Sequence, residues 1–204
     1  MKKLHTEILS QEQLKLLPLV EQYKDSHYLV GGTALALQFG HRRSIDFDLF
    51  SNQPLEPVKV LQQVKAVSSV DRVLVSSSDE LTLIANGVKM TWYNFGFTIP
   101  VAFEAEFCRL PDSLTIGAMK LFALGHRAKW KDYLDLYFIL KEFSLEQLVA
   151  RTKDLFSSAF EEKLARIQLT YFDDISYSEE INFMPDFVVE DAVVKQTLTQ
   201  IALG

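Results

Sequence analysis

Residues 28–50 read YLVGGTALALQFGHRRSIDFDLF, and this stretch decides the fold. Residues 28–30 form a short apolar run that predicts a strand, and the run stops at Gly31-Gly32. Residues 33–39 predict a helix that begins near Thr33 and stops at a glycine. Residues 45–50 alternate between apolar and acidic or aromatic side chains, which predicts a second strand. The expected unit is therefore a strand, a glycine turn, a helix and a strand.

Gly31 and Gly32 fall between the first strand and the helix. Two residues without side chains let the backbone approach a ligand closely, and a helix N-terminus directs N–H groups and a positive dipole at a phosphate. The same dipeptide is also common in an ordinary tight turn. The glycines alone leave a phosphate site and a plain turn both open.

Asp46 and Asp48 alternate along the second strand. Such positions project to one face of a sheet, about 6–7 Å apart. Two ionised carboxylates side by side repel each other unless a cation neutralises them, and their hard oxygen atoms suit a Mg²⁺ ion that also holds substrate phosphates. The alternative is a solvated strand face, with Ile45, Phe47 and Leu49 turned inward.

The composition is that of an ordinary globular protein. The chain has 204 residues, 48% of them hydrophobic and 24% charged, which is enough to bury a core without a disulfide or a structural metal. Its single cysteine, Cys108, cannot form an internal disulfide, and no apolar stretch is long enough to span a bilayer, so we expect a cytoplasmic protein. A net charge of -6 argues against nonspecific coating of nucleic acid, although Lys120 to Lys131 is a basic stretch.

The rest of the chain predicts an α+β protein with a small mixed or antiparallel sheet, flanking helices and a helical C-terminal half. Ser10 and Gln13 have capping-box spacing before a first helix, and Asn86-Gly87 predicts a two-residue hairpin within a stretch of period two. Four later stretches have helical patterns: 113–126, 133–143, 145–170 and 190–203. We expect an α/β core at 1–110 and a helical region at 111–204 that packs on the core and completes the active site.

Two blocks of sequence resemble a known family. The stretches that carry the resemblance are Gly31–Leu35, His41–Phe50, Ala118–Leu121, Arg127, Lys129 and Lys131–Tyr137. The first two resemble the signature of the nucleotidyltransferases typified by the AbiEii/AbiGii toxins, within the polymerase-β-like superfamily. The others are similar to a helical block of the same family.

This resemblance implies a nucleotidyltransferase that uses Mg²⁺ or Mn²⁺ to transfer a nucleoside monophosphate from an NTP to an acceptor hydroxyl. Asp46 and Asp48 would be catalytic and would hold the metal. The other residues with implied catalytic roles are Lys120 and Asp132. The residues with implied nucleotide-binding roles are Gly31, Gly32, Thr33, Ser44, Arg127, Lys131 and Asp135.

A third catalytic carboxylate is missing from its expected place. The superfamily usually supplies one from a neighbouring strand, but residues 88–93 contain no acid. Glu104 and Glu106 alternate on an expected strand at 101–107, and Glu104 is our candidate for a third metal ligand. Both glutamates could equally be exposed edge residues.

Several charged residues keep two interpretations. Lys131 and Asp135 have i,i+4 spacing and could be a surface ion pair rather than part of a nucleotide pocket. Residues 41–43, which read HRR, could contact nucleotide or acceptor RNA or be solvated loop charges. Residues 171–189 are expected to be a loop rather than a lid.

Partners follow from the resemblance. We expect RNA such as tRNA as the acceptor, a toxin role in a toxin–antitoxin or abortive-infection system, and a cognate antitoxin protein. The alternatives are a small-molecule acceptor, as for antibiotic-modifying enzymes, and a catalytically silent module that binds nucleotide or protein. A P-loop kinase is excluded by the lack of its motif, and a serine hydrolase by the lack of G-x-S-x-G.

Overall fold

The computed structural model describes residues 4–204 and divides the chain into two compact units, Met1–Asp112 and Ser113–Gly204. The elements of unit 1 are η1 (Thr6–Ile8), α1 (Gln11–Glu21), β1 (Tyr28–Val30), α2 (Gly31–Phe39), β2 (Asp46–Ser51), α3 (Pro57–Val67), β3 (Val70–Ser76), β4 (Glu80–Ala85), β5 (Val88–Asn94), β6 (Phe103–Glu104) and β7 (Arg109–Leu110). Those of unit 2 are α4 (Ser113–Leu124), α5 (Trp130–Ile139), α6 (Leu145–Phe156), η2 (Ser157–Ala159), α7 (Glu162–Gln168), η3 (Pro185–Phe187) and α8 (Asp191–Leu203).

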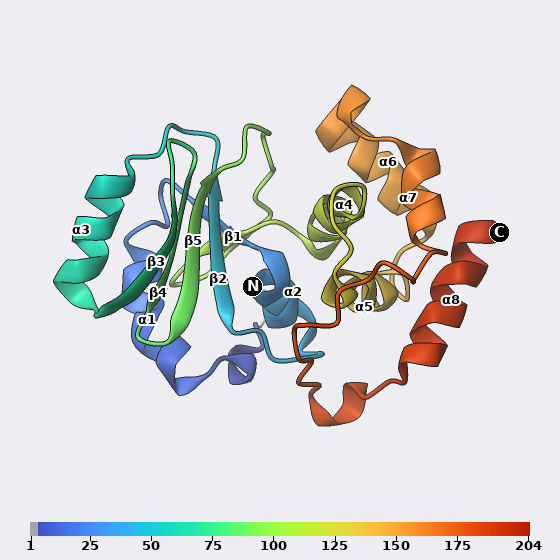
Figure 1. The fold of residues 1–204 in the computed structure, drawn as a ribbon, viewed down its shortest axis with the longest axis horizontal. Helices are drawn as coiled ribbons and strands as arrows, with labels where there is room; N and C mark the ends of the chain where they lie inside the picture. The colour runs from blue at the N-terminus through green and yellow to red at the C-terminus, as the bar shows by residue number, and fades with distance from the viewer. Residues whose placement is uncertain (1–3) are drawn as a thin grey trace. The chain divides into compact units, whose positions relative to one another are not determined.

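Within the described residues, five strands of unit 1 form one mixed sheet in the order β1-β2-β5-β4-β3 (Figure 1). The pairing of β2 with β5 is parallel, and the pairings of β1 with β2, β5 with β4, and β4 with β3 are antiparallel. The mixed sheet, its flanking helices and the helical C-terminal region confirm the predicted fold class. The acidic strand β2 therefore has a neighbour on each side.

One face of the sheet carries the hydrophobic core of unit 1. Phe47 and Leu49 of β2 are buried, as is Trp92 of β5. Figure 1 shows α1 and α3 on this side of the sheet, and the Tyr23 ring that follows α1 packs edge-on against Trp92 at 5.3 Å. Because side chains alternate along a strand, Asp46, Asp48 and Phe50 are left on the opposite, less buried face of β2.

The hairpin between β4 and β5 has the two-residue turn that the sequence predicts. Asn86 and Gly87 have φ angles of 49° and 76°, the positive values that a type I′ turn requires at both central positions. This turn fixes the register of the hairpin, in which Ala85 is the partner of Val88. The predicted hairpin is confirmed.

The strand expected at 101–107 is interrupted. The chain turns back after β6, and the Ala105 amide donates to the Cys108 carbonyl at 2.8 Å. β6 then pairs with β7 in a separate two-stranded sheet, in which Glu104 is the partner of Arg109. The prediction of one continuous strand carrying Glu104 and Glu106 is wrong, because this tight turn separates them.

Unit 2 contains the helices that the sequence predicts, except that one predicted helix is divided into two. The stretch expected as one helix at 145–170 forms α6 and α7, and the chain bends between them at Ser157, whose φ is 47°. Ser144 and Gln147 form the predicted capping box at the start of α6, as Ser10 and Gln13 do at the start of α1. Among the helices of residues 4–204, none has the length and apolar character needed to cross a membrane.

Residues 171–184 form an irregular segment between α7 and η3, which we name the strap. Ile175 is buried, and the backbone of Ser176 pairs with the chain just before α5. The Ser176 amide donates to the Ala128 carbonyl at 2.9 Å, and the Trp130 amide donates to the Ser176 carbonyl at 3.1 Å. The backbone of the strap is therefore bound at Ser176 to the N-terminal end of α5.

Candidate functional site

Asp46 and Asp48 lie side by side on the less buried face of β2, as the alternation predicts. Their strand is held on both sides: Asp48 is the partner of Val30 in β1, and Asp46 and Asp48 are the partners of Lys89 and Thr91 in β5. The side chain of Asp46 is 29% exposed, so a solvated cation can reach it. Two carboxylates on one rigid face form a donor set that suits Mg²⁺, which commonly takes one or two carboxylates and completes its shell with water and substrate phosphates.

Gly31 brings the start of α2 directly against this acidic pair. Its φ is 70°, and a β-carbon at this position would collide with Asp48 Oδ2. The backbone at the helix N-terminus therefore runs past the carboxylate with no room for a side chain. The first amide groups of a helix have no partner within it, so an anion bound beside Asp48 would meet donors as well as a metal ligand.

Thr33 and Gly32 connect α2 to β2 and to the segment before it. The Thr33 hydroxyl donates to the Asp46 carbonyl, which ties the helix to the acidic strand. A β-carbon on Gly32 would lie 2.5 Å from Arg42 Nη2 and 2.9 Å from Ser44 Oγ, so both side chains pack against this glycine. The structure thus gathers Gly31, Gly32, Thr33, Ser44 and both aspartates in one place, although Thr33 and Ser44 are themselves buried.

Arg42 is buried in this arrangement, whereas the sequence left it open as a solvated loop charge. The residue is 2% exposed, and Nη1 donates to the Arg43 carbonyl at 3.0 Å. His41 is also buried, whereas Arg43 is exposed. The interpretation of solvated loop charges holds for Arg43 alone. A charged run gives no local signal of which member the fold will bury.

Lys89 is a residue near the acids that the sequence reasoning missed. It is the partner of Asp46 in the parallel pairing of β5 with β2, and its Nζ lies 3.6 Å from Asp46 Oδ2. The hairpin turn sets the register of β5 against β4, but nothing local sets its register against β2. A cation therefore stands where the superfamily resemblance led us to look for a third acid.

Glu104, the candidate third metal ligand, does not join the two aspartates. It lies on the small β6–β7 sheet, its side chain is 69% exposed, and it forms an ion pair with Lys24 at 3.1 Å. Within residues 4–204 no cluster of three or more His, Cys, Asp and Glu side chains is arranged to hold a metal. The geometry supports a site of two carboxylates.

In unit 2, Lys120 is enclosed by carboxylates. Its Nζ lies 2.8 Å from Asp132 Oδ1 and 2.7 Å from Asp135 Oδ2, and all three side chains are buried. Arg127 Nε adds a contact of 3.2 Å to Asp132 Oδ2. Burial alone would raise the pKa of the Asp132 carboxyl, but Lys120 and Arg127 outweigh this effect and hold its pKa below the ordinary value. The geometry favours a structural role for this cluster, and the expected contact of Lys120 with phosphate stays a prediction.

Lys131 contacts the strap. Its Nζ lies 3.0 Å from Glu179 Oε2, and Lys129 Nζ lies 2.7 Å from Glu179 Oε1. The i,i+4 pair of Lys131 with Asp135 that the spacing suggests is replaced by this contact, since the Asp135 carboxylate faces Lys120. Lys131, a predicted nucleotide-binding residue, is therefore paired with an acid in this conformation.

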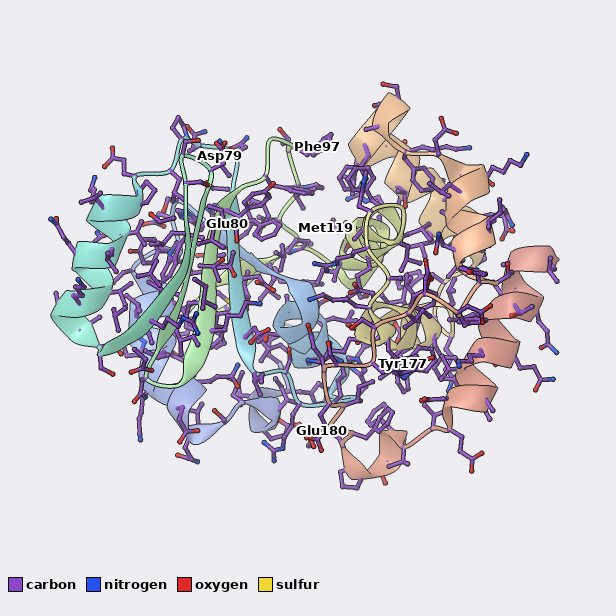
Figure 2. The ribbon with its side chains drawn as sticks, viewed as in Figure 1. Asp79, Glu80, Phe97, Met119, Tyr177 and Glu180 are labelled. Carbon is purple, nitrogen blue, oxygen red and sulfur yellow. The ribbon has the colours of Figure 1, made fainter. Side chains whose placement is uncertain are left out.

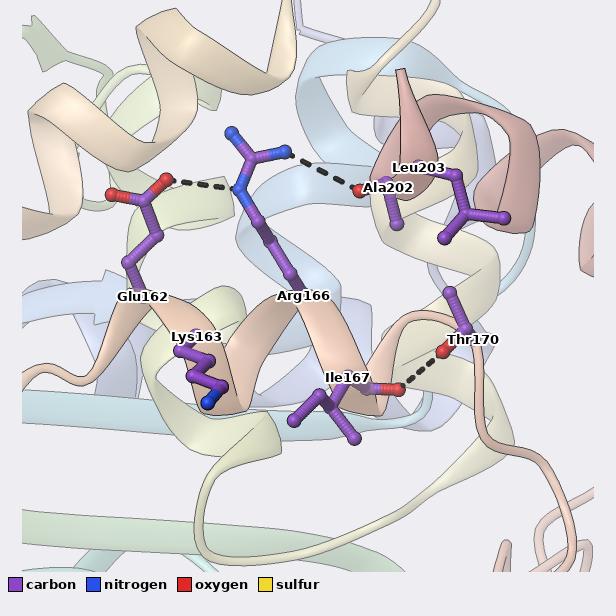
Figure 3. A pocket seen from close by; sticks show the side chains of 7 residues that line it. All are labelled: Glu162, Lys163, Arg166, Ile167, Thr170, Ala202 and Leu203. Atoms are coloured by element: carbon purple, nitrogen blue, oxygen red, sulfur yellow. Dashed lines mark hydrogen bonds and ion pairs between the residues drawn. The ribbon is translucent and has the colours of Figure 1, made fainter.

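Two other features lie apart from the predicted site residues. A surface pocket of about 460 Å³ lies between α7 and α8 and is lined by Glu162, Lys163, Arg166, Ile167, Thr170, Ala202 and Leu203 (Figure 3). None of these residues is in the predicted site. Cys108 is buried, and burial raises the pKa of its thiol to about 12, so it is not a nucleophile at neutral pH.

The fold is shared with solved structures. The nucleotidyltransferase toxin MenT4 of Mycobacterium tuberculosis superposes with a TM-score of 0.63 over 93% of this chain and 80% of its own, at 15% identity. A proposed nucleotidyltransferase of Helicobacter pylori superposes with a TM-score of 0.57 over 94% of this chain and 92% of its own, at 19% identity. The chain has a nucleotidyltransferase fold. At these identities the likeness is one of fold.

The sequence of the chain is similar to that of an uncharacterized protein over part of its length. No family model matches the chain. An uncharacterized protein of Aquifex aeolicus is 31% identical over 134 residues. The match covers 61% of this chain and 65% of that protein, so the chain spans less than two thirds of its relative.

Proposed function

We propose that this protein is a Mg²⁺-dependent nucleotidyltransferase that transfers a nucleoside monophosphate from an NTP to an acceptor hydroxyl. The observation that carries the proposal is the close approach of Gly31 to Asp48, which puts a helix N-terminus against the pair of carboxylates on β2, the strand held between β1 and β5. The nucleotidyltransferase fold supports it. This chemistry needs hydrogen-bond donors for the phosphates and oxygen ligands for a metal ion, and the amide groups at the start of α2 and the two carboxylates of β2 are the groups available for these roles.

The proposed roles follow from the atoms available. The amide groups at the start of α2 would bind the triphosphate, and Asp46 and Asp48 would hold the cation, which would stabilise the negative charge that develops on the transferred phosphate. The acceptor hydroxyl loses its proton to solvent and its oxygen bonds to the α-phosphorus, while the bond from that phosphorus to the oxygen bridging to the β-phosphate breaks and pyrophosphate leaves. The Thr33 hydroxyl, bound to the Asp46 carbonyl, keeps the two halves of the site in register.

For the acceptor we propose RNA, with tRNA as the first candidate, and for the biological role a toxin paired with an antitoxin. MenT4, which shares the fold, is a nucleotidyltransferase toxin. A small-molecule acceptor is the enzymatic alternative. The overall charge of -6 does not favour broad RNA coating, so we expect recognition confined to a local surface.

A catalytically silent nucleotide-binding module is the second candidate function. Lys89 favours it, because its ammonium group lies beside Asp46 and would compete with a metal ion for that carboxylate. A silent module would bind nucleotide without transferring it. Binding and transfer must therefore be measured separately.

The test is incubation of the purified protein with Mg²⁺, each [α-³²P]NTP in turn and total bacterial tRNA, read on a denaturing gel. We expect a labelled RNA band that is absent with Asp46→Asn, which removes one charge with little change of shape. Asp25→Asn, an exposed aspartate of the same unit, is the matched control and should retain labelling. Isothermal titration with Mg²⁺ and NTP distinguishes the candidates: binding without label indicates the silent module, and an active Asp46→Asn variant overturns the site.

A further inference from the structure

Glu179 lies between two lysines like a bound anion. Each oxygen of its carboxylate contacts a different ammonium group: Oε1 is 2.7 Å from Lys129 Nζ and Oε2 is 3.0 Å from Lys131 Nζ. A phosphate group likewise offers several oxygens on one central atom and would satisfy the same two donors. Lys129 immediately precedes α5 and Lys131 is in its first turn, so the positive end of the helix dipole adds to both charges.

The segment that carries Glu179 is largely exposed to solvent on both sides of this residue. Ile175 is buried and Ser176 is bound by two backbone hydrogen bonds, but residues 176–178 and Glu180 are exposed. Figure 2 labels Tyr177 and Glu180 on this part of the strap. The Tyr177 ring lies 5.4 Å from that of Trp130. The strap can therefore release its glutamate while it remains anchored at Ser176.

We infer that Lys129 and Lys131 form a binding site for phosphate oxyanions, and that Glu179 occupies this site until a substrate phosphate displaces it. The strap is thus a built-in competitor for the substrate. That the phosphate belongs to a reacting NTP or RNA rests on the proposed function, but the affinity of the two lysines for an anion does not. Partial burial acts to raise the pKa of Glu179, but the hydrogen bonds from both lysines outweigh it and bring this pKa to about 2, so the competing carboxylate is ionised at neutral pH.

The test measures the binding of inorganic pyrophosphate without metal, by isothermal titration. Glu179→Gln should tighten this binding by about fivefold or more, because it removes the anionic competitor for the two lysines. Glu180→Gln removes the same charge from the adjacent exposed position and should leave the affinity unchanged. Adding Lys131→Gln to Glu179→Gln should reverse the gain. Equal affinities for Glu179→Gln and Glu180→Gln would overturn the inference.

A second measurement uses the unaltered chain, so it does not depend on the folding of a variant. Pyrophosphate that displaces Glu179 should speed chymotrypsin cleavage after Tyr177, and an unchanged cleavage rate at saturating pyrophosphate counts against the strap. Repeating the titration with a short oligoribonucleotide distinguishes the two sources of phosphate. If Glu179→Gln binds only pyrophosphate more tightly, the site is assigned to the nucleotide. If it also binds the oligoribonucleotide more tightly, the site is assigned to the RNA backbone. Because no step uses Asp46, loss of nucleotidyl transfer would leave this result intact.

Discussion

Gly31 meets Asp48 at a distance that leaves no room for a side chain, and this single contact couples the Gly31-Gly32 turn to the acidic pair. Gly31→Ala should lower the free energy of unfolding by about 1 kcal/mol, since an L-residue is disfavoured at positive φ. The new methyl group should also push the flexible Asp48 carboxylate aside. We therefore expect Mn²⁺ binding, followed by electron paramagnetic resonance, to be lost.

Gly96→Ala is the matched control for that change. Gly96 also has a positive φ, 75°, but a β-carbon there would meet no atom within 4 Å. It should show a similar loss of stability in urea unfolding and retain Mn²⁺ binding. If Gly31→Ala binds Mn²⁺ as well as Gly96→Ala does, the Asp48 carboxylate is not where the cation binds.

Individual site residues could be predicted where the signal is local. Asp46 and Asp48 share a face because alternation along a strand is a property of the strand itself. The burial of Arg42 and the pairing of Lys131 with Glu179 could not be predicted, since both depend on chain segments far away in sequence. The position of Glu104 away from the two aspartates could not be predicted either, because it depends on the pairing of its strand with β7.

At the scale of the elements, the parallel pairing of β5 with β2 sets Lys89 beside Asp46. Both side chains are partly exposed, so the ion pair contributes at most about 1 kcal/mol. Lys89→Gln should therefore tighten Mn²⁺ binding by up to about fivefold, because the ammonium no longer competes with the cation.

Lys59→Gln provides the control for that prediction. It makes the same change of net charge on α3, where Lys59 pairs with Glu56 in an exposed position, and should leave Mn²⁺ affinity unchanged. A Lys89→Gln variant that binds NTP more weakly, with Mn²⁺ affinity unaltered, would instead show that Lys89 contacts the phosphates.

The elements themselves were more predictable than their partners. Capping boxes at Ser10 and Ser144 and the Asn86-Gly87 turn are short-range patterns, and each occurs as the sequence predicts. The break between α6 and α7 escaped prediction, because residues 145–170 contain no proline or glycine to mark it. The order β1-β2-β5-β4-β3 also has no local signal.

At the scale of the whole molecule, acid should destabilise the fold through its buried and paired carboxylates. Asp132 has a lowered pKa, because Lys120 and Arg127 outweigh its burial. A carboxyl group with a lowered folded pKa contributes stability above its ordinary pKa of about 3.9, and this contribution is lost as the pH falls toward the folded value. The urea concentration at the midpoint of unfolding should therefore fall when the pH is lowered below about 4.

Asp132→Asn separates this effect from general acid sensitivity. It should cost a few kcal/mol at pH 7, near the lower end of the roughly 3–5 kcal/mol for breaking a buried pair, because Lys120 keeps Asp135 as a partner. Its urea midpoint should then change less between pH 7 and pH 3 than that of the unaltered chain. Asp186→Asn, at an exposed site of the same unit, is the reference, and identical pH dependence in all three proteins would contradict the assignment.

The parallel pairing of β2 with β5 also determines the order in which the acidic face is assembled during synthesis. Asp46 and Asp48 leave the ribosome before the strand beside them, which ends only at Asn94, and α3, β3 and β4 are made in between. The hairpin of β4 and β5 can form from local contacts, whereas joining β5 to β2 requires closure of a long loop, which is entropically slow. A nascent chain therefore carries both aspartates well before it can hold them in their final setting.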